Sequence, residues 1–281
     1  MTQTWLITGS SRGFGRELAE AVLESGDNVV ATARRPEQLG PLVEKYGERV
    51  RTAALDVTDA AAAHAAVRLA LDAFGGLDVV VNNAGYANSA PIEEMPDDDF
   101  RAQIETNLFG VVNVTRAALP VLRKQRSGRF IQFSSVGGRV GGTPGMGAYQ
   151  TAKFAVEGFS EVLNNEVKPL GIKVTIVEPG AFRTDWQGSS MHRAEVGEDY
   201  DGTVGVINRF RDSTDGAQPG DPARAARVIT EVARLDAPPL RLLLGSDAVE
   251  FAETSSEGRA RETHAWAEVS RSTDFPGDEQ Q

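Results

Sequence analysis

Cysteine is absent from this 281-residue chain, so disulfide bonds and thiolate metal ligands are excluded. The three histidines, His64, His192 and His264, lie far apart without metal-ligand spacing, so we expect no metal site. Acidic residues outnumber basic ones, 40 against 29, and the formal charge of −11 argues against nucleic acid as a partner. No apolar run approaches the roughly 18 residues of a membrane span, and no secretory leader pattern follows Met1. These absences predict a cytoplasmic protein without a membrane partner.

Short, nearly continuous apolar runs alternate with segments of helical periodicity, as in strands that are covered on both faces. The expected strands are Thr4–Thr8, Asn28–Ala33, Val50–Leu55, Leu77–Val81, Arg129–Ser134, Lys173–Glu178 and Leu240–Leu244. The expected helices are Phe14–Glu24, Ala60–Ala73, Phe100–Lys124, Ala148–Lys168 and Pro222–Leu235. This alternation predicts an α/β fold with a parallel sheet, right-handed crossovers and helices on both faces. No linker divides the chain, so we expect a single domain over residues 1–281.

Two segments depart from the alternation. Residues 186–220 are polar, contain several glycines and lack a clear period, which predicts a long insertion between a strand and the next helix. Residues 270–281 are polar and predict a flexible tail. The helical pattern of Val249–Val269 before that tail is compatible with packing on the body or on a partner.

A glycine-rich turn follows the first expected strand. It reads Thr8-Gly9-Ser10-Ser11-Arg12-Gly13-Phe14-Gly15. Glycines at such a junction let the backbone approach a pyrophosphate, and the helix that follows supplies free amides and a positive dipole end. Directly after the first strand of a βαβ series, the turn predicts dinucleotide binding.

The end of the second strand predicts which dinucleotide is bound. An NAD site usually carries an acid there for the ribose 2′-hydroxyl, whereas this chain has Arg34 and Arg35. Arg34 is suited to a 2′-phosphate, with Arg12 on the other side of it. The alternative, that the arginines only solvate a helix start, fits Arg35 better than Arg34. We therefore expect NADP(H) to be preferred over NAD(H).

Polar and small residues follow the third and fourth strands. Asp56 suits either the adenine amino group or a helix N-cap, although Asp59 is the better cap for the helix at Ala60. Asn82-Asn83-Ala84-Gly85 closes the fourth strand at the edge where open α/β sheets bind ligands. A simple turn is the alternative for that motif.

Tyr149 and Lys153 lie four residues apart, which places them on the same face of a helix. A free tyrosine has a pKa of about 10 and is a poor acid at neutral pH. A neighbouring ammonium group is expected to lower that pKa toward the range that acid–base catalysis needs.

The motifs together resemble the short-chain dehydrogenase/reductase family, in its NADP(H)-preferring group. They are Thr8–Gly15, Asn82–Gly85, Tyr149-x-x-x-Lys153 and Pro179-Gly180, and the resemblance covers about residues 4 to 185. It implies a Rossmann-like, doubly wound sheet of about seven strands. It also implies a homodimer or homotetramer, assembled through the helices that hold Asn107 and Tyr149.

The resemblance also implies a site. The catalytic residues fall on Asn107, Ser135, Tyr149 and Lys153, with Ser134 as an alternative because Ser135 precedes the tyrosine by fourteen residues rather than the usual thirteen. We interpret the difference as a one-residue insertion in the loop Arg139–Gly147. The cofactor-binding residues are Gly9, Ser11, Arg12, Gly13, Phe14, Gly15, Arg34, Asp56, Val57, Asn83, Ala84, Gly85, Tyr149, Lys153, Pro179, Gly180, Phe182 and Thr184.

The expected reaction is hydride transfer between NADP(H) and a small carbonyl or alcohol substrate, with Tyr149 as general acid/base. Ser135 would orient the oxygen, Lys153 would lower the tyrosine pKa and bind the nicotinamide ribose, and Asn107 would connect the site to a proton supply through water. The alternatives are a non-catalytic dinucleotide sensor and an isomerase or dehydratase.

The substrate is less determined by the sequence. An apolar pocket for a bulky ketone and ordinary packing both suit Met146, Phe182, Trp186, Met191, Tyr200 and Phe210. Arg193 and Arg209 suit either an acidic substrate or, better, a solvated surface.

Overall fold

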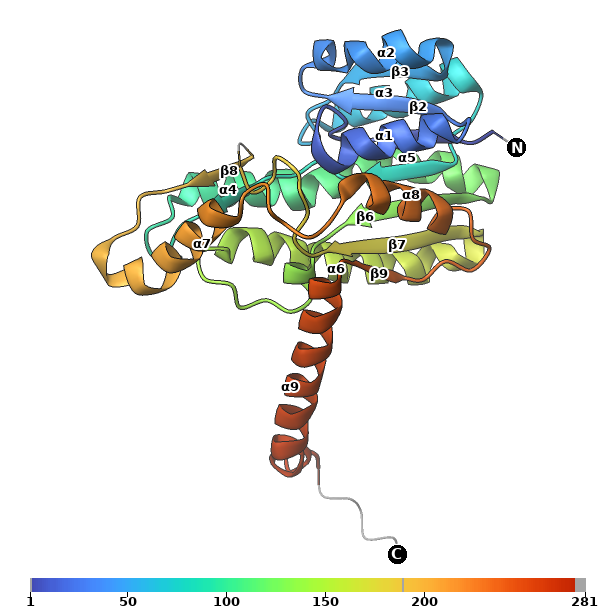
Figure 1. Cartoon of the computed structure of the whole chain (residues 1–281). Helices are drawn as coiled ribbons and strands as arrows, with labels where there is room; N and C mark the ends of the chain where they lie inside the picture. The colour runs from blue at the N-terminus through green and yellow to red at the C-terminus, as the bar shows by residue number, and fades with distance from the viewer. Residues whose placement is uncertain (1, 189, 276–281) are drawn as a thin grey trace, which may run out of the picture.

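The computed structural model describes residues 2–188 and 190–275 of the chain. Its centre is a seven-stranded sheet in the order β3-β2-β1-β4-β6-β7-β9, and all neighbouring strands in it are parallel (Figure 1). The strands are β1 (Thr4–Ile7), β2 (Asn28–Ala33), β3 (Val50–Ala54), β4 (Val79–Asn82), β6 (Gly128–Phe133), β7 (Ile172–Pro179) and β9 (Arg241–Leu244). Each strand falls on one of the seven apolar runs, which confirms the predicted Rossmann-like α/β fold.

Helices cover both faces of the sheet. They are α1 (Gly13–Glu24), α2 (Gly40–Tyr46), α3 (Ala60–Phe74), α4 (Asp97–Ile104), α5 (Gly110–Gln125), α6 (Gly147–Val167), α7 (Val206–Thr214), α8 (Pro222–Val232) and α9 (Ser246–Arg271). Neighbouring residues of β1 enter opposite cores, because successive side chains of a strand point to opposite faces. Ile7 packs with residues of α1 and α8, and Leu6 with residues of α3, α5 and α6. Both are fully buried, which accounts for the continuous apolar runs.

Several elements differ from the sequence-based expectation. The helix predicted over Phe100–Lys124 begins earlier, at Asp97, and consists of α4, a π-helical turn over Glu105–Phe109, and α5. Helices α2 and α7 were not predicted, nor was the parallel pair β5 (Ala87–Ser89) and β8 (Met191–Arg193). These strands are three residues long and pair across about a hundred residues, so no local periodicity reveals them.

The segment 186–220 lies between β7 and α8 and contains β8, a 3₁₀ turn over Glu198–Tyr200, a π-helical turn over Asp201–Gly205, and α7. Polar contacts hold it to the body. Ser89 Oγ donates to Asn208 Oδ1 at 2.7 Å, and Gly197 N donates to Glu94 Oε2 at 3.0 Å. The insertion is therefore folded over the sheet edge rather than a bare loop.

Helix α9 buries Ala248 and Ala252 against the body at its beginning and then projects away from it (Figure 1). Arg259, halfway along, still donates to the Arg139 carbonyl at 2.8 Å. Of the predicted tail, Ser270 and Arg271 belong to α9, and residues 276–281 lie outside the described part of the chain. Among the described helices, none has both the length and the apolar character needed to cross a membrane. That the whole chain is one domain stays a prediction.

Candidate active site

A cavity of about 590 Å³ opens at the carboxyl-terminal edge of the sheet. It lies beside β1 and β4, where the order of the strands reverses and open α/β sheets bind ligands. The predicted site residues that line it are Gly9, Ser11, Arg12, Gly13, Phe14, Arg34, Asp56, Val57, Asn83, Ala84, Gly85, Asn107, Ser135, Tyr149, Lys153, Pro179, Gly180, Phe182 and Thr184. Gly15 is the one predicted residue that does not line the cavity.

Gly15 instead allows α1 to pack closely on the turn. A Cβ atom at this position would lie 2.2 Å from the Gly9 carbonyl oxygen and 2.6 Å from Asn83 Nδ2. Gly9 itself has a φ of +69°, which favours glycine. Asn83 completes the turn, because its Nδ2 donates to the Thr8 carbonyl at 2.9 Å. The turn and the end of β4 are thus joined into one unit that shapes the cavity wall.

Arg34 and Asp56 form the end of the cavity that lies beyond β2 and β3. Asp56 Oδ1 accepts hydrogen bonds from the Thr58 amide at 3.0 Å and the Thr58 hydroxyl at 2.8 Å. These bonds, and the charge of Arg34 to a smaller degree, hold the pKa of Asp56 below its usual value. Asp59 is the N-cap of α3, so the capping alternative for Asp56 is wrong. Arg35 is exposed and does not line the cavity.

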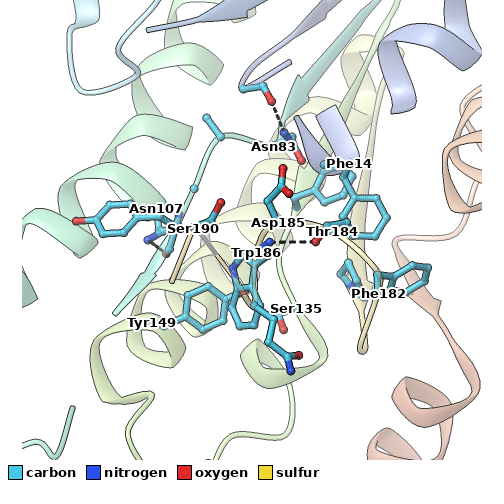
Figure 2. A pocket seen from close by; sticks show the side chains of 18 of the residues that line it. Phe14, Asn83, Asn107, Ser135, Tyr149, Phe182, Thr184, Asp185, Trp186 and Ser190 are labelled. Carbon is cyan, nitrogen blue, oxygen red and sulfur yellow. Dashed lines mark hydrogen bonds between the residues drawn. The ribbon is translucent and has the colours of Figure 1, made fainter. Parts of the chain in front are cut away.

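Tyr149 is buried on α6, and its ring lies beside that of Trp186 with 5.2 Å between centroids (Figure 2). The Ser135 side chain forms a hydrogen bond with the Tyr149 phenol, and this bond lowers the pKa of Tyr149. Ser134 Oγ instead donates toward the Lys153 carbonyl oxygen at 3.5 Å. Both serines touch the cavity, but of the two it is Ser135 that contacts the phenol.

Burial raises the pKa of Tyr149 to about 12, against the lowering effects of Ser135 and the charge of Arg211. The expectation that Lys153 lowers this pKa is therefore not met by the structure, because removing the phenolate from water outweighs the nearby charges. Lys153 Nζ lies 5.7 Å from the Tyr149 ring centroid and donates to the Phe133 carbonyl at 2.7 Å. Burial lowers the pKa of Lys153 to about 8, while Glu157 opposes that shift.

Asn107 lies in the π-helical turn, and its side chain fixes the backbone of Tyr86. Nδ2 donates to the Tyr86 carbonyl at 2.9 Å, and Oδ1 accepts from the Tyr86 amide at 3.2 Å. A Cβ atom at Gly85 would lie 2.3 Å from Asn107 Oδ1 and 3.8 Å from Lys153 Nζ. The absence of a side chain at Gly85 therefore lets the Asn107 amide and the Lys153 ammonium approach the same point.

The end of β7 forms the opposite wall. Pro179 ends the strand, and Gly180 leaves room for Asp247, whose carboxylate would lie 2.3 Å from a Cβ there. Asp247 Oδ2 accepts from the Ala181 amide at 2.7 Å. The Phe182 ring packs on Phe14 at 4.9 Å, and Thr184 Oγ1 accepts from the Trp186 amide at 3.3 Å (Figure 2). This arrangement joins the turn after β7 to α1.

Residues 3–195 match the family model of the short chain dehydrogenases. The chain belongs to this family.

This short-chain dehydrogenase is similar over nearly its whole length to other known proteins. It is 51% identical over 271 residues to the oxidoreductase BOA17 of Botryotinia fuckeliana, covering 96% of this chain and 98% of the relative. A short-chain dehydrogenase structure from Streptomyces avermitilis shares 41% identity and a TM-score of 0.92, covering 98% of this chain and 100% of that one. An alcohol dehydrogenase from the archaeon Thermococcus sibiricus, solved with 5-hydroxy-NADP, shares 26% identity and a TM-score of 0.71, covering 87% of this chain and 96% of that one. The predicted family is confirmed, and the protein is an oxidoreductase enzyme.

The aromatic and sulfur-containing residues proposed for a substrate pocket divide into two groups. Phe182, Trp186 and Phe210 line the cavity of this short-chain dehydrogenase. Met146 and Met191 are buried in a small cluster that supports Tyr149, and the Tyr200 hydroxyl hydrogen-bonds to Glu93, outside the cavity. The pocket interpretation is wrong for these three residues, because their side chains are used in packing or surface contacts.

Sequence reasoning missed other cavity residues. Among them are Tyr86 and Thr106 near Asn107, Gln187, Ser190, Ile207 and Arg211 from the insertion, and Asp247 and Phe251 from α9. Tyr86 follows directly on Asn82–Gly85, so that motif was a usable signal. The residues of α7 and α9 carried none, because their position depends on how segments distant in sequence pack.

Two buried carboxylates lie behind Lys153. Glu157 follows it by one helical turn, and Glu178 is fully buried on β7. Arg241 Nε lies 3.1 Å from both Glu157 Oε2 and Glu178 Oε1. Burial raises the pKa of Glu157 to about 7, although the hydrogen bond with Ser134 lowers it, and burial also raises the pKa of Glu178.

The raised pKa of Glu157 predicts a fall in stability with increasing pH. A carboxyl whose pKa is higher in the folded state stabilises the fold fully below its unfolded value of 4.5, and this contribution is lost as the pH rises through about 7. Glu157→Gln keeps the neutral form at every pH. Between about pH 5 and pH 8, we therefore expect the free energy of unfolding of the wild type to fall by about 1–3 kcal/mol more than that of the variant.

Chemical denaturation at the two pH values measures this difference. Glu161→Gln is the matched control. Glu161 also lies on α6 and also pairs with Arg241, but its side chain is about half exposed. In this control, the free energy of unfolding should depend on pH as it does in the wild type. An unchanged pH dependence in Glu157→Gln would show that Glu157 is not the titrating group.

Proposed function

We propose that this short-chain dehydrogenase is an NADP(H)-dependent oxidoreductase that interconverts a carbonyl compound and a secondary alcohol by hydride transfer. The observation that carries the proposal is one cavity that joins the glycine turn at Gly9 to the Tyr149 phenol and its Ser135 partner. A cavity with a backbone-lined anion site at one end and a buried acid at the other suits a dinucleotide that reacts with a carbonyl group.

The residues present fit a nicotinamide dinucleotide. Gly9 and Gly13 both have positive φ and expose backbone at the start of α1, whose amides attract a pyrophosphate. When bound, the cofactor supplies the hydride. Gly180, Phe182 and Thr184 are proposed to hold the nicotinamide end, since they line the cavity on the side opposite Arg34 and Asp56.

In the reducing direction, Tyr149 donates its proton to the carbonyl oxygen. Burial keeps the phenol protonated at neutral pH but makes it a weaker acid than free tyrosine, so its proton transfer depends on groups that stabilise the phenolate. Ser135 hydrogen-bonds with the reacting oxygen and orients it. The charge of Arg211 stabilises the phenolate that proton transfer leaves. Asn107 Oδ1 keeps a second lone pair beside Lys153, which suits a water on the path that returns the proton.

The NADP(H) preference rests on Arg34 and Arg12, which line the cavity while the end of β2 carries no acid. The likeness to an alcohol dehydrogenase solved with 5-hydroxy-NADP supports a nicotinamide dinucleotide as the cofactor.

Replacing Arg34 with Ala tests the cofactor preference. We expect the Kd for NADPH to rise about 10- to 100-fold, because a charge-assisted hydrogen bond to the 2′-phosphate is lost. The Kd for NADH should change little. Fluorescence titration with both cofactors measures the two constants, and Arg35→Ala is the neighbouring control. Tighter binding of NADH than NADPH by the wild type would refute the preference.

A spectrophotometric panel of ketones and aldehydes, with NADPH and NADH side by side, tests the reaction. Net cofactor oxidation by at least one carbonyl compound is expected. A non-catalytic sensor would bind NADPH tightly and oxidise none of it, and an isomerase or dehydratase would convert its substrate without net consumption. Nothing in the structure favours either alternative over the reductase.

Assembly and location complete the proposal. A homodimer or homotetramer through the helices of Asn107 and Tyr149 is supported by exposed apolar side chains there, which are Phe109, Phe154 and Val162. The cytoplasmic location stays a prediction from the sequence.

A further inference from the structure

Helix α7 brings a cation to the substrate side of the cavity. Arg211 lines the same cavity as Tyr149 and Trp186. Its Nη1 atom is buried and has no hydrogen-bond partner within the described part of the chain. None of the ion pairs formed among residues 2–188 and 190–275 includes Arg211. Arg211 as a whole is half-buried, and a guanidinium partly withdrawn from water without an anion is costly, so a site of this kind favours a ligand that supplies one.

Its neighbours are already paired. Arg193 Nη1 lies 3.2 Å from Asp212 Oδ1, and its Nη2 donates to the Gln187 carbonyl at 2.6 Å. Arg209 pairs with Asp201 on the outer surface. From the sequence, Arg193 and Arg209 were candidates for binding an acidic substrate. In the structure, both side chains pair with other groups of the protein. Arg211, which the sequence did not single out, is the arginine that α7 contributes to the cavity.

The helix that carries Arg211 is fixed in place. Gln187 Nε2 donates to the Arg211 carbonyl at 2.6 Å and to Thr214 Oγ1 at 3.0 Å. Buried Asn208 accepts the hydrogen bond from Ser89 described above. Three hydrogen bonds thus join α7 to Gln187, which lines the cavity, and to β5, so the guanidinium is presented from an anchored helix.

The charge of Arg211 acts on the Tyr149 phenol. It lowers the pKa of Tyr149, and Tyr149 in turn opposes the lowering of the Arg211 pKa that burial and Arg193 cause. Three acids line the cavity, namely Asp56, Asp185 and Asp247, and none of them pairs with Arg211. Asp56 is bonded to Thr58 and Asp247 to Ala181, so these two carboxylates have other partners.

We propose that the substrate is an oxo acid, whose carboxylate binds Arg211 while its carbonyl oxygen faces Tyr149. This inference rests on the proposed function, because it places the carbonyl group at Tyr149. A guanidinium matches a carboxylate with two parallel hydrogen bonds, which fixes orientation as well as affinity. Trp186, Ile207 and Phe210 line the cavity beside it and suit an apolar remainder of the substrate.

Matched pairs of acids and esters test the proposal with the full-length enzyme and NADPH. The probes are phenylpyruvate, benzoylpropionate and levulinate, each beside its methyl ester, which keeps the ketone and removes the charge. In the wild type, kcat/KM for the preferred acid should exceed that for its ester by about 10- to 100-fold. Arg211→Met should bring this ratio close to one, and Arg211→Lys should keep part of it. Arg209→Met, on the same helix but outside the cavity, should keep the wild-type ratio.

Calorimetry provides a readout that does not depend on turnover. Benzoylpropionate and its methyl ester are titrated into the enzyme with NADP⁺, and the acid should bind about 10- to 100-fold more weakly to Arg211→Met than to the wild type. Equal binding of acid and ester by the wild type would overturn the oxo-acid proposal. So would a loss in Arg211→Met that is the same for both probes.

The two proposals fail in different ways. Reduction of neutral ketones and esters with no preference for acids would refute the oxo acid and keep the oxidoreductase. Binding that depends on Arg211, without NADPH oxidation by any member of the panel, would support the carboxylate site and refute the carbonyl reduction.

Discussion

Replacing Tyr149 with Phe is expected to lower kcat for carbonyl reduction by about 10²- to 10⁴-fold, the usual contribution of a positioned general acid. The phenylalanine ring keeps the contact with Trp186 and the small cluster with Met146 and Met191, so the fold of the site should persist. What is lost is the proton that the reacting oxygen receives. Steady-state kinetics with NADPH and a reducible ketone measures the effect.

Two further measurements separate loss of the acid from damage to the site. The Kd for NADPH, from fluorescence titration, should stay within about threefold of the wild type, since the phenol is one contact among many. Tyr200→Phe, which removes a phenol outside the cavity, should leave kcat unchanged. Wild-type turnover in Tyr149→Phe would rule out Tyr149 as the acid.

Replacing Gly15 with Ala is expected to damage both stability and cofactor binding. The added methyl group would lie 2.2 Å from the Gly9 carbonyl oxygen, which is backbone and cannot move aside as a flexible side chain can. Overpacking of this kind costs about 1–3 kcal/mol, or roughly 3–10 °C in melting temperature for a chain of this size. The backbone that must move is that of Gly9, which lines the cavity. We therefore also expect the Kd for NADPH to rise by about tenfold or more.

Gly258→Ala is the matched control for that substitution. Gly258 lies within α9, and the position of its Cβ has only the end of the flexible Arg261 side chain within 4 Å, at 3.9 Å. The same change of residue should therefore stabilise the protein, by about 0.5–1 kcal/mol, because alanine loses less backbone entropy in a helix. Thermal unfolding of both variants, with and without NADPH, compares the two effects. A melting temperature for Gly15→Ala equal to that of the wild type would contradict the close packing of α1 on the turn.

The sequence predicts the sheet well, and it identifies most of the residues that line the cavity around the glycine turn, because both depend on local signals. Strands covered on both faces are continuous apolar runs, and turns that approach a ligand need glycine at fixed positions. Gly15 shows the limit of this reasoning. It belongs to the motif but serves helix packing, and only the distance from its Cβ position to Gly9 distinguishes the two roles.

The part of the cavity that the insertion and α9 form could not be predicted in the same way. Met191 is an apolar residue in a polar segment and suggested a pocket, yet it pairs with Ala87 in β5 and packs under Tyr149. Arg211 looked like one surface arginine among several, and its partial burial results from the anchoring of α7 by Gln187 and Ser89. The pKa of Tyr149 was predicted in the wrong direction because sequence spacing reveals neighbouring charges but not the loss of water around the phenol.

The participation of Asp247 and Phe251 in the cavity has a consequence for biosynthesis. The wall of the cavity extends from Gly9 to Phe251, so its first and last residues are separated by nearly the whole time of translation. Chains fold from the N-terminus as they emerge, and β1, β2 and β3 can pair early. The turn at Gly180 gains its carboxylate partner only when the start of α9 has left the ribosome. A nascent chain that stops before this point carries most of the sheet but an unfinished cavity wall at the end of β7.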